Sequence, residues 1–125
     1  MIYSWIALPT VMYGGYALLQ LVAGDGDSEF RRTWFRAGHA HAGVLLLMSL
    51  LYYDFIGRTE LPSLWKQIGC GVLIAGILAQ SGGFFIHMVK GGAGKTSIGT
   101  TITSMGAVVL TAAIAILVFG LFTAP

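Results

Sequence analysis

Four long apolar stretches separated by short polar loops constrain this chain more than any other feature of its sequence. The stretches cover residues 3–23, 35–56, 64–89 and 98–122. A helix needs about 20 apolar residues to cross the hydrocarbon core of a bilayer, and each stretch is long enough. Short connections make consecutive helices antiparallel neighbours. The sequence therefore predicts an all-α fold, a single-domain up-down bundle of four transmembrane helices.

The composition leads to the same expectation. Hydrophobic residues make up 56% of the 125 residues and charged residues only 10%, whereas soluble domains carry roughly 25% charged residues. So few charges cannot cover a water-facing surface, and we expect a multi-pass protein of the cell membrane, embedded in the lipid bilayer. The net charge of +2 then belongs to loops beside lipid headgroups, so no nucleic-acid partner is expected.

The first apolar stretch differs from a cleaved signal peptide. No Lys or Arg precedes it, and it is longer than the signal core of about 7–15 residues. Tyr13, Tyr16 and Gln20 also recur within it at helical spacing. We expect this stretch to be retained as a membrane helix.

Basic residues fall unevenly on the two sides of the expected bundle. One side carries Arg31, Arg32, Arg36, Lys90 and Lys95, and the other carries Arg58 and Lys66. Membrane proteins keep an excess of Lys and Arg in their cytoplasmic loops. The loops at residues 24–34 and 90–97 are therefore predicted to be cytoplasmic, with both termini outside.

Small residues repeat along the third stretch. Gly69, Gly76 and Gly83 are seven residues apart, so they lie on one face of a helix. Small residues let membrane helices approach closely. The repeat predicts tight packing of this helix against another, either within the chain or in a homo-oligomer.

Polar side chains gather in the half of the bundle next to the basic loops. They are Gln20, His39, His41, Gln80, His87, Thr100, Thr101, Thr103 and Ser104. Ionisable side chains at membrane depth are costly and mark functional sites by default. The alternative is structural: the histidines, above all His87, would lie at the membrane surface, and the amide and hydroxyl groups would bond between helices.

The spacing of the histidines limits what they can bind together. His39 and His41 are about 200° apart around an α-helix, so a regular helix cannot easily direct both to one metal ion. The sequence leaves open which of them faces inward. Gln80, Gly83 and His87 share one helix face, where the glycine leaves room for a flat ligand or another helix.

Haem is the cofactor that these residues suit best. Neutral imidazole ligates haem iron and other transition metals, and Arg31, Arg32 and Arg36 could anchor the anionic propionates. A zinc site of three histidines and a proton relay are the alternatives, since histidine titrates near neutral pH.

The stretch GGAGKTS, residues 91–97, looks like a nucleotide-binding loop. That motif requires glycine where this chain has Val89, and it follows a strand, not an apolar helix. No nucleotide is expected to bind. Thr96 or Ser97 is instead predicted to be the N-cap of the fourth helix.

The stretch AHAGV at residues 40–44, preceded by Arg36, resembles the small membrane isomerases that include styrene oxide isomerase and hydroxylaminobenzene mutase. The pattern of that family is closer to A-H-x-E-G, so this chain lacks the acidic residue and its spacing is one residue short. The resemblance implies haem b bound between the protomers of a trimer, with ferric iron acting as a Lewis acid on the substrate oxygen. The axial ligand position matches His41 best, with His39 as the alternative.

The leading hypothesis is a small membrane protein that binds haem or another metal, an isomerase of a hydrophobic substrate. Its expected residues are His41 or His39 as metal ligand, His87 and Gln80 lining the site, Arg31, Arg32 and Arg36 at the propionates, Tyr13 or Tyr16 as proton donor, and Thr100 and Ser104 at the substrate oxygen. One rival is a small transporter or proton-conducting bundle, although no carboxylate lies within the spans near the histidines. The other is a non-catalytic accessory subunit of a membrane complex.

Overall fold

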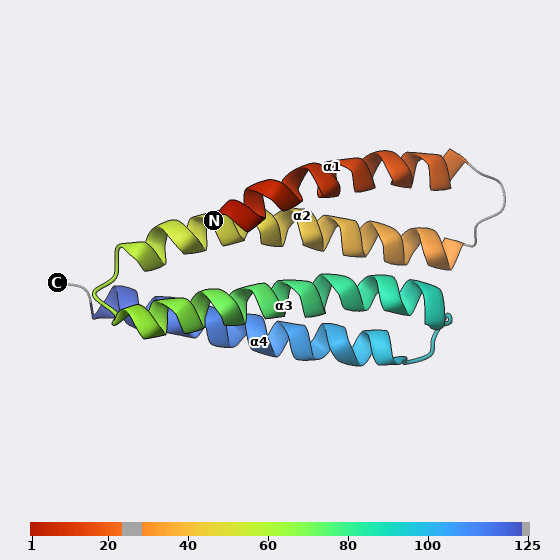
Figure 1. Ribbon diagram of the computed structural model, residues 1–125. Helices are drawn as coiled ribbons and strands as arrows, with labels where there is room; N and C mark the ends of the chain where they lie inside the picture. The colour runs from red at the N-terminus through yellow and green to blue at the C-terminus, as the bar shows by residue number, and fades with distance from the viewer. Residues whose placement is uncertain (24–28, 124–125) are drawn as a thin grey trace.

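The structure, a computed structural model, describes residues 1–23 and 29–123, with the backbone only for residues 18–23. It consists of four α-helices: α1 (Ile2–Ala23), α2 (Glu29–Gly57), α3 (Ser63–Lys90) and α4 (Ile98–Phe122). Successive helices run in alternating directions (Figure 1). Helices α2, α3 and α4 are each long and apolar enough to cross a membrane. The prediction of an all-α chain of four helices is confirmed.

Helix α2 begins earlier than its apolar stretch. Its first residue is Glu29, six residues before Phe35, so the predicted loop is wrong for residues 29–34. The polar start is helical because a carboxylate in the first turn interacts favourably with the helix dipole, and because Phe30 and Trp34 pack on α3. Residues 24–28 lie outside the described part of the chain. His39 and His41 consequently lie well inside α2.

Helices α3 and α4 pack most closely, along two matching repeats of small residues. The buried members are Gly69, Gly76 and Gly83 on α3, and Gly99, Gly106, Ala113 and Gly120 on α4. A Cβ added at Gly83 would lie 2.6 Å from the carbonyl oxygen of Gly99. Only glycine allows the two backbones to come so near. The tight packing predicted for the third helix therefore occurs within the chain.

The hydrophobic core is built by α2, α3 and α4. Its buried side chains are Leu45, Tyr52 and Ile56 from α2, Leu73 and Ile77 from α3, and Leu110 and Ala113 from α4. The hydroxyl of Tyr52 donates a hydrogen bond of 2.9 Å to the carbonyl oxygen of Ala113, which ties α2 to α4.

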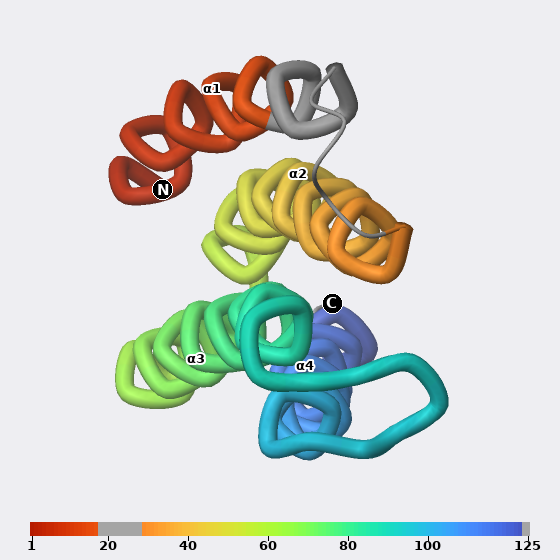
Figure 2. Tube along the Cα trace, turned by 90° about the vertical axis from the view of Figure 1, so that its right-hand side faces the viewer, coloured from red at the N-terminus to blue at the C-terminus, as the bar shows by residue number. Residues whose placement is uncertain are grey.

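Helix α1 lies at the edge of the molecule, against α2 (Figure 2). The hydroxyls of Ser4 and Ser49 are 2.7 Å apart and join the two helices by a buried hydrogen bond. Among its described side chains, α1 contributes none to the hydrophobic core. It forms one wall of a groove instead.

Candidate functional site

The half of the molecule expected to hold a site is formed by the beginning of α2, the end of α3 and the beginning of α4 (Figure 1). His39, His41 and His87 all lie in this half. Their imidazole rings, however, face three different neighbours.

His39 lies between α1 and α2. A Cβ added at Gly14 would be 3.2 Å from its Nδ1 atom, and one added at Gly15 would be 3.3 Å from its Nε2 atom. The ring of Phe35, one turn earlier, is stacked on the same side at 6.5 Å between centroids. The half-buried imidazole thus fills a notch that two glycines make in α1.

His41 faces α3 and is half-buried. Its Nδ1 atom lies 2.8 Å from the carbonyl oxygen of Ala37. Because a carbonyl can only accept, Nδ1 donates this bond, and in the neutral imidazole the lone pair is then on Nε2. The ring lies 4.6 Å from that of Phe84. This tautomer is the one that a metal-binding histidine adopts.

His87 is among the most buried side chains, with 1% of its surface exposed. Its Nδ1 atom is 2.6 Å from the hydroxyl of Ser97, which also accepts a bond from the backbone of Gly99. The rings of Trp34 and Phe30 lie 4.0 and 5.4 Å away between centroids. His87 therefore connects α2, α3 and the N-cap of α4. The prediction that Ser97 or Thr96 caps this helix is confirmed for Ser97.

The hydroxyls expected near a substrate oxygen bond to their own helix. Thr100 completes the capping box by accepting from the backbone nitrogen of Ser97 at 3.0 Å. Ser104 is exposed and donates to the carbonyl oxygen of Thr100 at 3.0 Å. Gln80 is half-buried on α3, where its backbone carbonyl oxygen accepts a bond from the hydroxyl of Thr103. Among the described residues, no hydrogen bond joins these three side chains to an imidazole.

The expected proton donors lie on the outside of α1. Tyr13 and Tyr16 are 69% and 57% exposed, and their rings are 6.0 Å apart. In the described part of the chain neither ring contacts an imidazole. The side chain of Gln20 lies outside the described residues.

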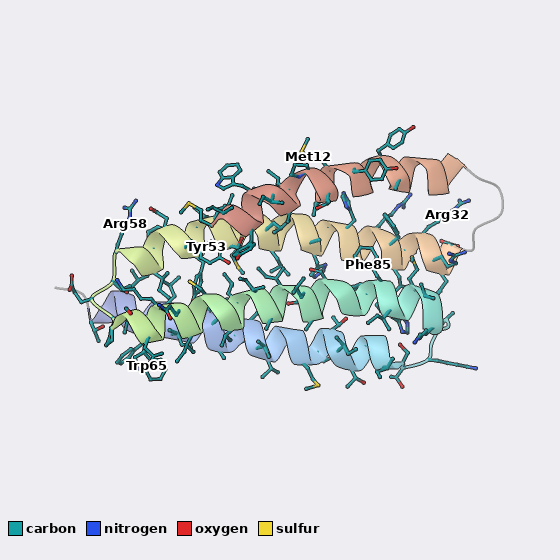
Figure 3. The ribbon with its side chains drawn as sticks, viewed as in Figure 1. Met12, Arg32, Tyr53, Arg58, Trp65 and Phe85 are labelled. Carbon is teal, nitrogen blue, oxygen red and sulfur yellow. The ribbon has the colours of Figure 1, made fainter. Side chains whose placement is uncertain are left out.

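The three arginines expected to hold propionates lie in the first three turns of α2. Arg31 and Arg36 are exposed, and Arg32 is half-buried at the end of the molecule (Figure 3). Arg36 shares its face of α2 with the exposed residues Ala40 and Val44. The arginines are therefore at the same end as the histidines, but Arg36 lies on an outer face.

A groove between α1, α2 and α3 holds a residue that the sequence reasoning missed. Two adjoining cavities of about 280 and 140 Å³ share the residues Ala7, Leu46, Ile77 and Leu78. The larger is also lined by Val11, Ala42, Ser81, Gly82 and Phe85, and Figure 3 shows Phe85 between α2 and α3.

Ser81 is the polar residue of the larger cavity. The residue is buried, with 7% of its surface exposed, and its hydroxyl has no hydrogen-bond partner within the described residues. The sequence could have indicated this residue, because Ser81 lies four residues from both Ile77 and Phe85 and its hydroxyl is therefore on an otherwise apolar helix face.

A polar cavity of about 530 Å³ opens at the end of the molecule. It lies between the first turns of α2 and the loop that joins α3 to α4. Its lining residues are Glu29, Phe30, Thr33, Trp34, His87, Gly92, Ala93, Gly94, Lys95 and Thr96. Of the cavities described here, it is the one lined by charged side chains of both signs, and His87 is the histidine in its lining.

The residues fit a metal or haem in part. No group of three or more His, Cys, Asp or Glu side chains that could hold a metal ion occurs in the described residues. His41 offers a free Nε2 lone pair to haem iron. Neither His39 nor His41 lines these three cavities or a fourth, apolar one between α3 and α4 at the opposite end. The donor fits, but these cavities give it no slot for a macrocycle.

No protein-family model, curated protein or solved structure matches this chain. The resemblance to the small membrane isomerases therefore depends on its short motif. The groove and the histidines are the features of the structure that bear on function.

Proposed function

We propose that this chain is an integral membrane protein that binds an apolar molecule carrying one hydrogen-bonding oxygen. The molecule would occupy the groove between α1, α2 and α3. The observation that carries the proposal is the buried hydroxyl of Ser81, which has no hydrogen-bond partner among the described residues and lies in an otherwise apolar cavity.

The apolar outer surface supports insertion into a bilayer. Val44, Leu47 and Leu51 form an exposed stripe on α2, and Met105, Val108 and Ile114 are exposed on α4. Soluble monomers rarely expose contiguous apolar patches of this kind. Together with the length of α2, α3 and α4, this apolar surface favours four membrane spans, with α1 as the fourth. The excess of Arg and Lys in the segments at residues 24–34 and 90–97 favours their placement on the cytoplasmic side.

The unpaired hydroxyl gives the groove its specificity. Leaving a buried hydroxyl without a partner costs about 1–3 kcal/mol. A ligand oxygen that accepts from Ser81 would recover part of this free energy, whereas a pure hydrocarbon would not. The cavity of about 280 Å³ is close to the lower end of small-molecule sites, roughly 300–1,000 Å³. A single-ring ketone, alcohol or epoxide has the matching size and chemistry.

Binding of acetophenone and ethylbenzene tests this proposal, because the two molecules differ in one carbonyl oxygen and little in size. Both are titrated by ligand-observed NMR into protein purified in maltoside detergent. A net hydrogen bond of about 1 kcal/mol predicts that acetophenone binds roughly fivefold more tightly. Ser81→Ala should abolish the preference, and Ser104→Ala, which removes an exposed hydroxyl on α4, should keep it. Equal binding of both probes to the wild type, or a preference retained by Ser81→Ala, would disprove the assignment.

A second candidate is haem b binding through His41, favoured by the bond between its Nδ1 atom and Ala37. His41 would hold the haem through Nε2, and the haem iron would supply a Lewis acid. The test is the absorption spectrum of protein expressed with haem supplied. A near-stoichiometric Soret band that disappears in His41→Ala and persists in His39→Ala supports this candidate, and a flat spectrum removes it.

A further inference from the structure

The polar cavity at the end of the molecule differs in chemistry from the groove. The carboxylate of Glu29 lies at the first turn of α2, and the ammonium group of Lys95 lies on the loop after α3. Both side chains are exposed at the rim. Thr33 and Thr96 add hydroxyls to the same lining. A ligand that enters this cavity therefore meets opposite charges on opposing elements.

The floor of the cavity is made of three rings that pack on one another. Phe30 and Trp34 are 6.1 Å apart between centroids, and both rings contact His87. Ser97 holds His87 through Nδ1, and in the described part of the chain no hydrogen bond is made to Nε2. The faces of Trp and Phe rings attract cations. The aromatic floor and Glu29 thus favour a cationic group, while Lys95 favours an anionic one.

We infer that this cavity binds a zwitterionic phosphate–amine group of the kind found in phosphocholine and phosphoethanolamine. The amine lies against Glu29 and the rings of Trp34 and Phe30, and the phosphate lies against Lys95. An anion alone would meet the carboxylate of Glu29 unpaired, and a cation alone would meet the ammonium of Lys95 unpaired. Only a ligand with both charges pairs both side chains.

Two kinds of molecule could supply this phosphate–amine group: a phospholipid, through its headgroup, or a soluble molecule. The cavity lies where α2 begins and α3 ends, which in the proposed membrane protein is the level of the headgroups. The lipid source rests on the proposed membrane insertion. Recognition of the phosphate–amine group does not depend on membrane insertion, and it is also independent of the groove at Ser81.

Fluorescence of Trp34 provides the test. Trp5 and Trp65, both exposed, are replaced by Phe so that Trp34 remains as the reporter. The protein in maltoside detergent is titrated with phosphocholine, with choline and with inorganic phosphate. Phosphocholine should bind roughly fivefold more tightly than either half, as expected for one exposed charge contact or cation–π contact.

Substituting each of the two exposed charged residues tests the contribution of each charge separately. Glu29→Gln and Lys95→Gln should each weaken phosphocholine binding roughly fivefold. The matched controls Glu60→Gln, at the opposite end, and Lys90→Gln, beside the loop but outside the cavity lining, should leave it unchanged. The inference is overturned if Trp34 shows no saturable change. It is also overturned if phosphate binds as tightly as phosphocholine and binds better to Glu29→Gln, the result of a plain anion site.

Lipid nanodiscs identify the source. If the ligand is a headgroup, phosphocholine should change Trp34 fluorescence in phosphatidylglycerol discs but not in phosphatidylcholine discs, where the cavity is already filled. If the ligand is soluble, the two titrations should agree. Either result supports the inference, and a titration absent from both discs and from detergent contradicts it. Failure of acetophenone binding would remove the groove proposal and leave this result untouched.

Discussion

Two neighbouring glycines of α3 give the sharpest test of the close packing of α3 on α4. A Cβ added at Gly83 would lie 2.6 Å from the carbonyl oxygen of Gly99 and 2.6 Å from the backbone nitrogen of Thr103. Reaching an ordinary contact of 3.4 Å requires α3 and α4 to separate by about 0.8 Å. Backbone atoms cannot rotate away as a side chain can, so the whole contact has to open.

Gly83→Ala should therefore cost about 3 kcal/mol, the upper part of the range for overpacked cores. A gap of this size forfeits between a quarter and a half of each dispersion contact along the pair. Gly82→Ala is the matched control, because nothing lies within 4 Å of its added Cβ. Alanine there should be neutral or stabilise the helix by up to about 1 kcal/mol.

The assay is reversible unfolding in mixed micelles with sodium dodecyl sulfate, followed by far-ultraviolet circular dichroism. The two variants should differ in their free energies of unfolding by about 3–4 kcal/mol. A difference below about 0.5 kcal/mol, the usual effect of a surface substitution, would refute the close approach of α3 and α4.

The same assay tests two further contacts. Ser97→Ala removes both the N-cap of α4 and the partner of His87 Nδ1, and should lower the free energy of unfolding by about 1–2 kcal/mol. Thr101→Ala is the control, because it removes an exposed hydroxyl in the same turn, and it should lower this free energy much less. Equal effects of the two substitutions would count against the bond to His87. Tyr52→Phe removes the bond to the Ala113 carbonyl and should cost about 1 kcal/mol. Tyr3→Phe, exposed on α1, is its control, and an unchanged free energy of unfolding for Tyr52→Phe would show that the bond between α2 and α4 contributes nothing.

Apolar length and glycine spacing predicted most of the fold. The ends of α1, α3 and α4 agree with the apolar stretches because hydrophobicity changes sharply at those loops. The start of α2 does not, because Glu29 to Trp34 form a polar turn that is stabilised by packing on α3 and by the helix dipole. The repeat of small residues on α4 was equally visible in the sequence. That it packs against the repeat on α3 could be seen only in the structure.

The candidate site was harder to predict because depth along a helix does not fix direction around it. His39 and His41 were expected to point in different directions, one of them away from the bundle, since two residues span about 200°. In the structure both are half-buried against helices of the same chain, His39 against α1 and His41 against α3. Which neighbour each would face depends on the positions of α1 and α3. His87 was expected near the membrane surface from its distance to Lys90, but its burial by other side chains was not expected. Phe30 and Trp34, from a part of α2 that was predicted as loop, cover it.

The groove and the core together suggest how a ligand could reach Ser81. Helix α3 is fixed against α4 by contacts between backbones, so the hydroxyl of Ser81 has a defined position. Helix α1 forms the opposite wall, and its described side chains take no part in the core. Elements with few buried apolar contacts open at the lowest free energy. Displacing α1 would break the bond between Ser4 and Ser49 and expose the apolar lining of the groove, but it would leave the packing of α2, α3 and α4 intact. One wall of the groove, α3, is rigid and carries the hydroxyl of Ser81, whereas the other wall, α1, can open at a low cost in free energy. The groove can therefore admit an apolar ligand while the helices that bind it stay folded.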